Sequence, residues 1–226
     1  MNENEKSFIK LAGSINSNCS KERAQLLLEF ITQERIKEGL LVCPASSSKS
    51  YHHCFEGGLL HHINQMIKIA LCMRECGQPI IDRITTENLV TVIVLHDLHK
   101  ICDPYGKSYY VTNLLKSGKA SESKPFKIAD NFNDLSTAMS KYGDAILDYF
   151  MEHSDIKPSG HLSLLTLINF GIKLYNDLSD DEKHAIIYHG GTYEVSKFEL
   201  RGKESMLQLV LHSADMLSSR FHEDEW

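Results

Sequence analysis

The amino-acid sequence predicts an all-α domain with room for one small β-hairpin insertion. Apolar residues recur at helical spacing along most of the long segments, as they do between Leu59 and Ala70. Helix-start signals precede several of these segments, and Ser179 with Glu182 three residues later has the spacing of a capping box. No pattern of buried strands alternating with helices is present, so a parallel-sheet fold is not expected.

Length and composition indicate one globular domain. A chain of 226 residues can bury a substantial core, and no linker rich in proline, glycine and serine divides it. We expect residues 1–50 to form a helical extension that packs on the core, residues 51–220 to form the main domain, and residues 221–226 to be an acidic tail. The hydrophobic content of 42% and the charged content of 24% are ordinary for a soluble globular protein.

The net charge of −6 bears on the partners of the protein. A mildly acidic chain lacks the basic surface that follows a long phosphate backbone, which favours small phosphorylated substrates over duplex nucleic acid. Six cysteines without paired CxxC spacing, and no secretory signal, predict reduced thiols in the cytoplasm. No apolar run approaches the ~20 residues of a membrane span, so no membrane partner is expected. The oligomeric state stays open, and a homo-oligomer is one option.

The first half of the chain contains expected helices with one polar loop between them. The helices are expected at residues 1–18, 20–39, 59–76 and 85–98, and the loop at residues 42–50. Ser20 and Thr85 are suitable N-caps, and Gly39 is expected to close the second helix. The polar loop either lines the mouth of a pocket or is a solvated connector.

The second half contains the region in which the hairpin is expected. The stretch from Ser108 to Val111 has short-strand propensity, and the stretch from Lys116 to Lys127 has the composition of an exposed loop. Further helices are expected at residues 134–153, 162–175, 180–188 and 204–220. The lysines between Lys107 and Lys124 form a locally basic flank, which suits a phosphate or is merely solvated.

His96 and Asp97 stand side by side at the end of a strongly apolar stretch that begins at Leu89. Burying an unpartnered carboxylate beside an imidazole costs several kcal/mol, so the pair requires a counter-charge. A divalent cation would supply it. The alternative is a hydrogen-bonded pair at a helix end, which is the usual role of a single His-Asp dipeptide.

Two further residues of ligand type lie on predicted helices. His62 lies between Leu59 and Met66 at helical spacing and therefore points to the side that those residues bury. Asp215 lies on the last helix, three residues after His212, which could orient it. A core histidine with satisfied hydrogen bonds is the alternative role of His62.

These motifs stand in a fixed order along the chain. The segment from His52 to His62 reads His-His-Cys-Phe-Glu-Gly-Gly-Leu-Leu-His-His, and the His-Asp doublet and the late aspartate follow it. The set resembles the HD-domain metal-dependent phosphohydrolases, and most closely the branch whose first motif is His-His-x-aromatic-x-Gly-Gly-Leu-Leu-x-His. The resemblance extends from Tyr51 to Arg220 and implies an HD-domain helical bundle. A departure is Gly190, where the family has a second histidine after His189.

The resemblance implies a centre with one or two divalent ions. The ligands of the first ion would be His62, His96, Asp97 and Asp215. A second ion would be bridged by Asp97 and completed by His161 and His189, with His153 as the rival of His161. Nitrogen and oxygen donors without thiolate suit manganese, iron, cobalt, nickel or zinc better than a pure magnesium site.

The resemblance also implies catalytic and substrate-binding residues. Asp97 would orient the attacking water, and Lys100 with one of His52 or His53 would stabilise phosphate oxygens or the leaving group. Lys100 is also well placed to interact with the helix C-terminal dipole. The expected substrate contacts are His52, Lys107 and Tyr193.

Such a centre suits hydrolysis of a phosphate ester, because a metal ion lowers the pKa of bound water and neutralises charge on a phosphoryl group. The resemblance makes a nucleotide the expected substrate, cleaved at a phosphoester or phosphoanhydride bond. Other functions stay open: a short-oligonucleotide 3'-5' exonuclease or cyclic-nucleotide phosphodiesterase, a di-iron HD-type oxygenase, and a non-catalytic nucleotide-binding regulatory module. The complete ligand set favours an enzyme, because a module that only binds does not need every ligand.

Overall fold

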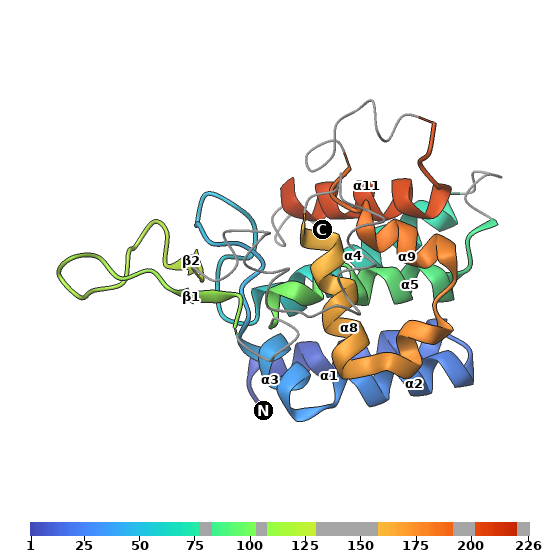
Figure 1. Cartoon of the computed structure of the whole chain (residues 1–226), viewed down its shortest axis with the longest axis horizontal. Helices are drawn as coiled ribbons and strands as arrows, with labels where there is room; N and C mark the ends of the chain where they lie inside the picture. Colours follow the sequence, from blue (N-terminus) through green and yellow to red (C-terminus); the bar gives the residue numbers. More distant parts are fainter. Residues whose placement is uncertain (77–82, 103–107, 130–157, 192–201, 221–226) are drawn as a thin grey trace, which may run out of the picture.

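The structure is a computed structural model, and it describes residues 1–76, 83–102, 108–129, 158–191 and 202–220. Within these ranges the chain is mainly helical (Figure 1). The helices are α1 (Glu3–Asn18), α2 (Lys21–Ile31), α3 (Glu34–Val42), α4 (Gly58–Glu75), α5 (Thr86–Leu95), the short 3-10 helix η2 (Leu98–Lys100), α8 (Pro158–Asp177), α9 (Asp180–Ile187) and α11 (Met206–Arg220). The predicted all-α class is therefore confirmed for the described part of the chain. None of these helices combines the length and the hydropathy of a membrane-spanning segment.

A two-stranded antiparallel sheet forms the predicted hairpin. β1 (Tyr110–Thr112) pairs with β2 (Phe126–Ile128), with Tyr110 opposite Ile128. The hairpin projects from one side of the helical body (Figure 1). The sequence indicated a strand close to β1 but assigned Phe126 and Lys127 of β2 to an exposed loop, because the stretch from Lys116 to Lys127 is mostly polar. The helix expected at residues 134–153 and the tail at residues 221–226 lie outside the described residues.

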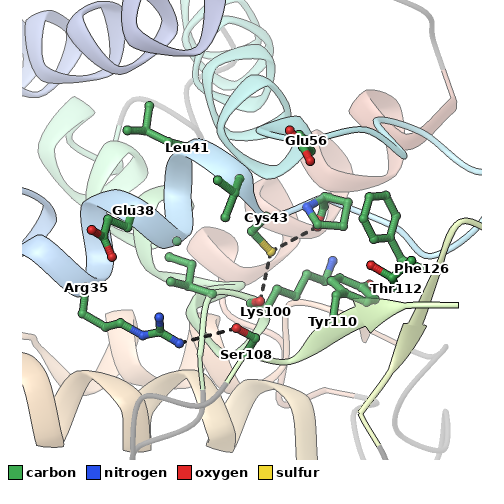
Figure 2. A pocket seen from close by; sticks show the side chains of 14 residues that line it. Arg35, Glu38, Leu41, Cys43, Glu56, Lys100, Ser108, Tyr110, Thr112 and Phe126 are labelled. Atoms are coloured by element: carbon green, nitrogen blue, oxygen red, sulfur yellow. Dashed lines mark hydrogen bonds between the residues drawn. The ribbon is translucent and has the colours of Figure 1, made fainter.

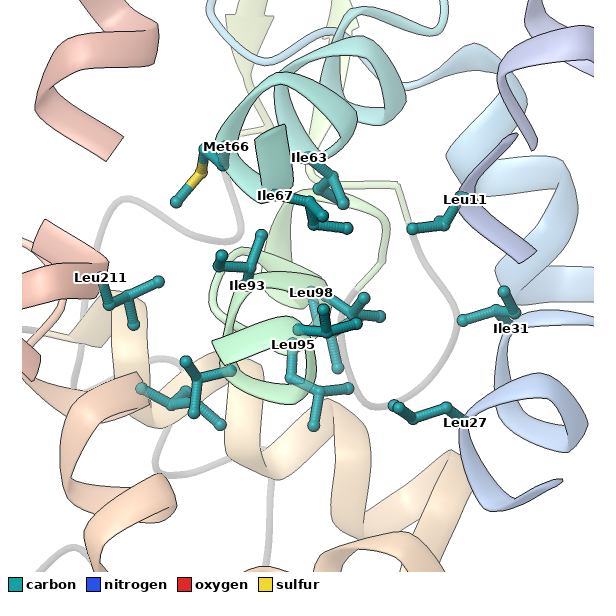
Figure 3. Packing of buried hydrophobic residues seen from close by; sticks show 14 of the residues in the cluster. Leu11, Leu27, Ile31, Ile63, Met66, Ile67, Ile93, Leu95, Leu98 and Leu211 are labelled. Atoms are coloured by element: carbon teal, nitrogen blue, oxygen red, sulfur yellow. The ribbon is translucent and has the colours of Figure 1, made fainter. Parts of the chain in front are cut away.

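Helix α5 runs through the centre of the molecule. All of its residues from Leu89 to Leu95 are buried, and it packs against α1, α4, α8, α9 and α11. Figure 3 shows the side chains of α5 and η2 among those of α4 above them and those of α1 and α2 to the right. The helix therefore ends inside the protein. His96 and Asp97, which follow Leu95 directly, are buried for that reason.

The N-terminal helices share one hydrophobic core with the rest of the described chain. α1 packs against α4 and α5, and α2 packs against α8. Leu11, Leu27 and Phe30 are almost completely buried in that core. An ion pair between Arg23 and Glu182, with 2.8 Å from Nη1 to Oε1, joins α2 to α9. Packing is continuous across residue 50, since α1 and α3 both contact α4. The domain boundary expected there stays a prediction.

The helix-start signals are confirmed, whereas the expected stop at Gly39 is wrong. The side chain of Thr85 caps α5, and Ser179 with Glu182 forms a capping box at α9. Gly39 instead lies inside α3, after a break that separates α3 from α2. A Cβ at Gly39 would collide with the side chain of Ile101, so the glycine permits a close approach between α3 and the segment after η2.

Candidate metal centre

Two glycines at the start of α4, the N-cap Gly57 and the first helical residue Gly58, bring three histidines together. Gly57 has a φ of 78°, in the left-handed region that glycine adopts without strain, and a Cβ at Gly58 would collide with the carbonyl oxygen of His53. The chain can therefore turn tightly into α4. The ring centroids of His52 and His53 lie 4.7 and 5.7 Å from that of His62. His53 itself has a φ of 47°, which is uncommon for a residue other than glycine.

His62 is fully buried on α4, and hydrogen bonds hold its ring in one orientation. Its Nδ1 lies 2.9 Å from the hydroxyl of Ser218, which donates its own hydrogen to Oε1 of Gln65 at 2.8 Å. Nδ1 therefore carries the proton of this contact, and Nε2 keeps a lone pair. Nε2 has no hydrogen-bond partner among the described residues, and it lies 3.2 Å from Oδ1 of Asp215.

Backbone carbonyl groups orient His96 and His189 in the same way. Nδ1 of His96 lies 2.8 Å from the carbonyl oxygen of Ile93, and Nδ1 of His189 lies 2.8 Å from that of Ile186. A carbonyl oxygen only accepts, so both Nδ1 atoms donate, and in the neutral form of each ring Nε2 keeps a lone pair that a metal ion can bind. These Nε2 atoms lie 3.2 and 3.6 Å from the two carboxylate oxygens of Asp97.

The ligand atoms of His62, His96 and Asp215 lie within 4.8 Å of one another, close enough to hold one metal ion. Imidazole lone pairs and carboxylate oxygens that face each other repel unless a cation lies among them. The buried Nε2 atoms without hydrogen bonds and the adjacent carboxylates therefore fit a divalent transition ion. Asp97, which is 5% exposed, stands beside this group through its contact with His96.

A second group of three donors consists of His52, His53 and His62, whose ligand atoms also lie within 4.8 Å of one another. His62 belongs to both groups but has one available lone pair, so it can serve only one of them at a time. The group with Asp215 is favoured, because a carboxylate offsets the charge of a divalent ion and neutral imidazoles do not. Burial lowers the pKa of His52 to about 3, which keeps its imidazole neutral.

Asp97 and Lys100 form a close ion pair, with 2.6 Å between Nζ and Oδ2. Nζ also donates to the carbonyl oxygen of Ala45 at 3.0 Å. Burial alone would raise the pKa of Asp97, but Lys100 and His96 hold it well below its usual range. Burial alone would lower the pKa of Lys100, but Asp97 together with Tyr110 and Asp215 raises that pKa above its usual range. Lys100 thus fixes the carboxylate in place and keeps it ionised.

The second carboxylate, Asp215 on α11, is ionised as well. Burial would raise its pKa, but the neighbouring His62 and His96 lower it by more. Burial lowers the pKa of His62, so that imidazole is neutral. For His96 the effect of burial is outweighed by Asp97, and its pKa is raised. The two carboxylates therefore favour positive charge at the point where the candidate ligands meet.

A cavity of about 720 Å³ opens onto these residues, and its size is typical of a small-molecule site. Asp97, Asp215 and His189 line it, together with the expected substrate and catalytic residues His52 and Lys100. Further lining residues that sequence reasoning missed are His99, Tyr109, Ser219 and Arg220. A signal for Arg220 was present, because it ends the same helix that carries Asp215.

Two supporting contacts were not expected from the sequence. The hydroxyl of Ser163 on α8 donates to the carbonyl oxygen of His96 at 2.6 Å and lies 2.9 Å from Nδ1 of His99. It therefore connects α8 to the doublet. His212, which was expected to orient the late aspartate, donates from Nδ1 to the carbonyl oxygen of His189 at 2.8 Å. It connects α11 to the second residue after the end of α9.

The ligands expected for a second ion are less completely assembled. His161 is fully buried at the start of α8, but it belongs to neither group of three donors found among the described residues. His189 lies near Asp97, as noted above. A second ion held by Asp97, His161 and His189 stays a prediction. Lys107, Tyr193 and His153 lie outside the described residues.

Comparison of the chain with protein-family models, with curated proteins and with solved structures gives no match in any of the three. The resemblance to HD-domain phosphohydrolases therefore depends on the sequence motifs from His52 to Asp215 alone.

Proposed function

We propose that the protein is a metal-dependent phosphohydrolase with an HD-type helical bundle, which cleaves phosphoester or phosphoanhydride bonds of a nucleotide. The observation that carries the proposal is the meeting of His62, His96 and Asp215 beside Asp97, at a cavity large enough for a nucleotide. The order of these residues along the chain is that of the HD-domain family. The choice of a nucleotide follows from this resemblance.

The residues that would hold the ion are His62, His96, Asp97 and Asp215. When bound, a divalent ion lowers the pKa of water and offsets negative charge on a phosphoryl group. Asp97 accepts a hydrogen bond from Lys100 at Oδ2, which leaves Oδ1, on the side of His189, to orient the attacking water.

Substrate contacts would come from the other residues of the cavity. The ammonium of Lys100 has three N–H donors, of which two bind Asp97 and Ala45, and the third is available to a phosphate oxygen. Arg220 lines the same cavity and has the planar donor geometry that suits a phosphate. Neutral His52 can donate or accept one hydrogen bond there.

The test is phosphate release by protein that has been stripped with EDTA and reloaded with Mn²⁺. The substrates are nucleoside mono-, di- and triphosphates, cyclic nucleotides and short oligonucleotides, and the products are identified. Asp215→Asn should lower kcat by roughly 100-fold or more, the usual scale for losing a principal electrostatic contribution. Asp181→Asn, which removes an exposed carboxylate of α9, is the matched control and should leave kcat unchanged. Circular dichroism checks that both variants fold.

The products also separate the alternatives. Mononucleotides released from the 3' end of an oligonucleotide would identify an exonuclease, and opening of a cyclic nucleotide would identify a phosphodiesterase. Oxygen uptake by the iron-loaded protein without phosphate release would identify an oxygenase. Nucleotide binding without turnover under manganese, iron, cobalt, nickel and zinc would identify a regulatory module. Either of the last two results would overturn the proposal.

A further inference from the structure

A second cavity, of about 490 Å³, shares Lys100 with the cavity of the candidate metal centre (Figure 2). It lies between α3, the residues just after α3, the end of η2 and the β1–β2 hairpin, and we call it the α3–hairpin cavity. Lys100 is the one residue that lines both cavities within the described part of the chain. The proposed hydrolysis uses none of the other residues around it.

Arg35 of α3 is a cation without an ionic partner among the described residues at this cavity. Its guanidinium makes one long hydrogen bond, 3.5 Å from Nη2 to Oγ of Ser108 (Figure 2), and its Nε is buried without a hydrogen-bond partner. A guanidinium has five N–H donors in a planar fork that matches a carboxylate or a phosphate. A buried donor left without an acceptor is unfavourable, so Arg35 indicates that an acidic group binds here.

The rest of the lining is largely apolar and aromatic. Ile101 lies at the end of η2, and Tyr110 and Phe126 reach the cavity from the hairpin (Figure 2). Two carboxylates, Glu38 and Glu56, also line the cavity, but both side chains are exposed and stay hydrated. A cavity of this size and composition suits a ligand with a body of one or two rings.

We propose that the α3–hairpin cavity binds a small organic anion, with its carboxylate or phosphate monoester on Arg35 and its ring-sized body against Ile101 and Phe126. We further propose that its occupancy is coupled to the metal centre through Lys100.

The coupling follows from the bonds of Lys100. Its ammonium holds Asp97, while its backbone carbonyl accepts a hydrogen bond from the thiol of Cys43 at 2.9 Å. Cys43 and Lys100 both line the α3–hairpin cavity (Figure 2). A ligand anion that binds the third N–H of the Lys100 ammonium weakens the ion pair between Lys100 and Asp97, and so changes the affinity of Asp97 for a metal ion. By linkage, the ion changes the affinity of the ligand by the same factor.

Isothermal titration calorimetry of the EDTA-treated protein tests the site, with 1-naphthoate and 1-naphthyl phosphate as probes of the two acidic groups. We expect one-to-one binding of at least one probe. Arg35→Ala should weaken that binding by roughly 10- to 100-fold, the scale of a lost hydrogen bond to a charged group. Arg35→Lys should retain part of it. Lys173→Ala, which removes an exposed cation of α8, and Arg220→Ala, in the other cavity, should leave it unchanged.

A second variant guards against a folding defect in the first. Thr112 is exposed on β1 and lines the cavity, so Thr112→Trp should fill the space and abolish binding without disturbing the core. For the coupling, saturating 1-naphthoate should change the Kd of Mn²⁺ by about fivefold or more in the wild type, the lower end of allosteric effects, and should not change it in Arg35→Ala.

The proposal is overturned if neither probe binds, or if binding survives both Arg35→Ala and Thr112→Trp but falls in Arg220→Ala. That second result would place the ligand in the catalytic cavity instead. An unchanged Kd of Mn²⁺ in the presence of bound 1-naphthoate would overturn the coupling. Because every readout is a binding constant, these outcomes do not depend on whether the protein hydrolyses a nucleotide.

Discussion

Two buried charged clusters of this protein differ in how their donors and acceptors are matched. In the first cluster the buried Arg23 lies 2.8 Å from the buried Glu182 and 2.7 Å from the exposed carboxylate of Asp177, and it donates to the hydroxyl of Thr91. The second oxygen of Glu182 accepts hydrogen bonds from the backbone and hydroxyl of Ser179. Positive and negative charges face each other directly, and the cluster is closed.

The second cluster has more acceptors than donors. The carboxylates of Asp97 and Asp215 face the Nε2 atoms of His62, His96 and His189, and Nδ1 of each ring already donates to the protein, so each neutral ring presents a lone pair at Nε2. The cation of Lys100 serves Asp97 alone among these groups. The closed cluster of Arg23 holds helices together. The second cluster, which we call the open cluster, has surplus buried acceptors and is arranged to receive a cation.

The largest expected effect comes from a substitution that breaks the closed cluster. Arg23→Ala leaves Glu182 buried and without its cation, and we expect the free energy of unfolding to fall by about 3–5 kcal/mol, as for other broken buried ion pairs. Urea denaturation measures the change, with Lys21→Ala on the exposed side of the same helix as the control. A loss below about 1 kcal/mol would place this pair with surface salt bridges instead.

The next largest expected effect comes from binding of a metal ion to the open cluster. Mn²⁺ at about 100 times its Kd should raise the free energy of unfolding by ~2.7 kcal/mol, because the ion binds the folded protein and not the unfolded chain. EDTA should reverse the gain, and Asp215→Asn should abolish it. Thermal unfolding with and without the ion measures the effect. An equal gain in the Asp215→Asn protein would show that the ion binds elsewhere.

The parts of both clusters that could be predicted from the sequence are those with a local pattern. The capping box at Ser179 and Glu182 is a spacing within one turn, and the buried face of His62 follows from helical periodicity. The doublet at His96 and Asp97 follows an apolar run that could only be interior. These positions needed no knowledge of which helices pack together.

The parts that could not be predicted depend on contacts between distant segments. A glycine such as Gly39 is typical of a helix end. In the structure Gly39 instead lets α3 pack closely against Ile101, which is 62 residues later in the chain. Ser218 and Gln65 each lie three residues after a candidate ligand, but their pairing across α4 and α11 sets the tautomer of His62. A serine or a glutamine three residues after a histidine or an aspartate occurs on many helices. The spacing alone therefore cannot identify the pair that orients a ligand.

The role of Ser218 gives a sharper test of the open cluster. Ser218→Ala removes the acceptor that fixes Nδ1 of His62, and we expect the affinity for Mn²⁺ to fall by roughly 10- to 100-fold, as for other residues that orient a metal ligand. Calorimetry of the metal-free protein with Mn²⁺ measures it. Ser213→Ala on the same helix, whose hydroxyl donates to the carbonyl oxygen of Leu209, is the control. Equal affinities in the two variants would contradict the assigned tautomer.

The smallest expected effect is a loss of stability without a loss of metal affinity, which would show that the two clusters act independently. Ser179→Ala removes one hydrogen bond to Glu182 and the cap of α9, and we expect the free energy of unfolding to fall by ~1 kcal/mol, the usual value for a lost N-cap. Because Glu182 belongs to the closed cluster, the affinity for Mn²⁺ should not change. Urea denaturation and calorimetry on the same preparation measure both quantities. A change in metal affinity without a change in stability would mean that the clusters are coupled through α9, which ends two residues before His189.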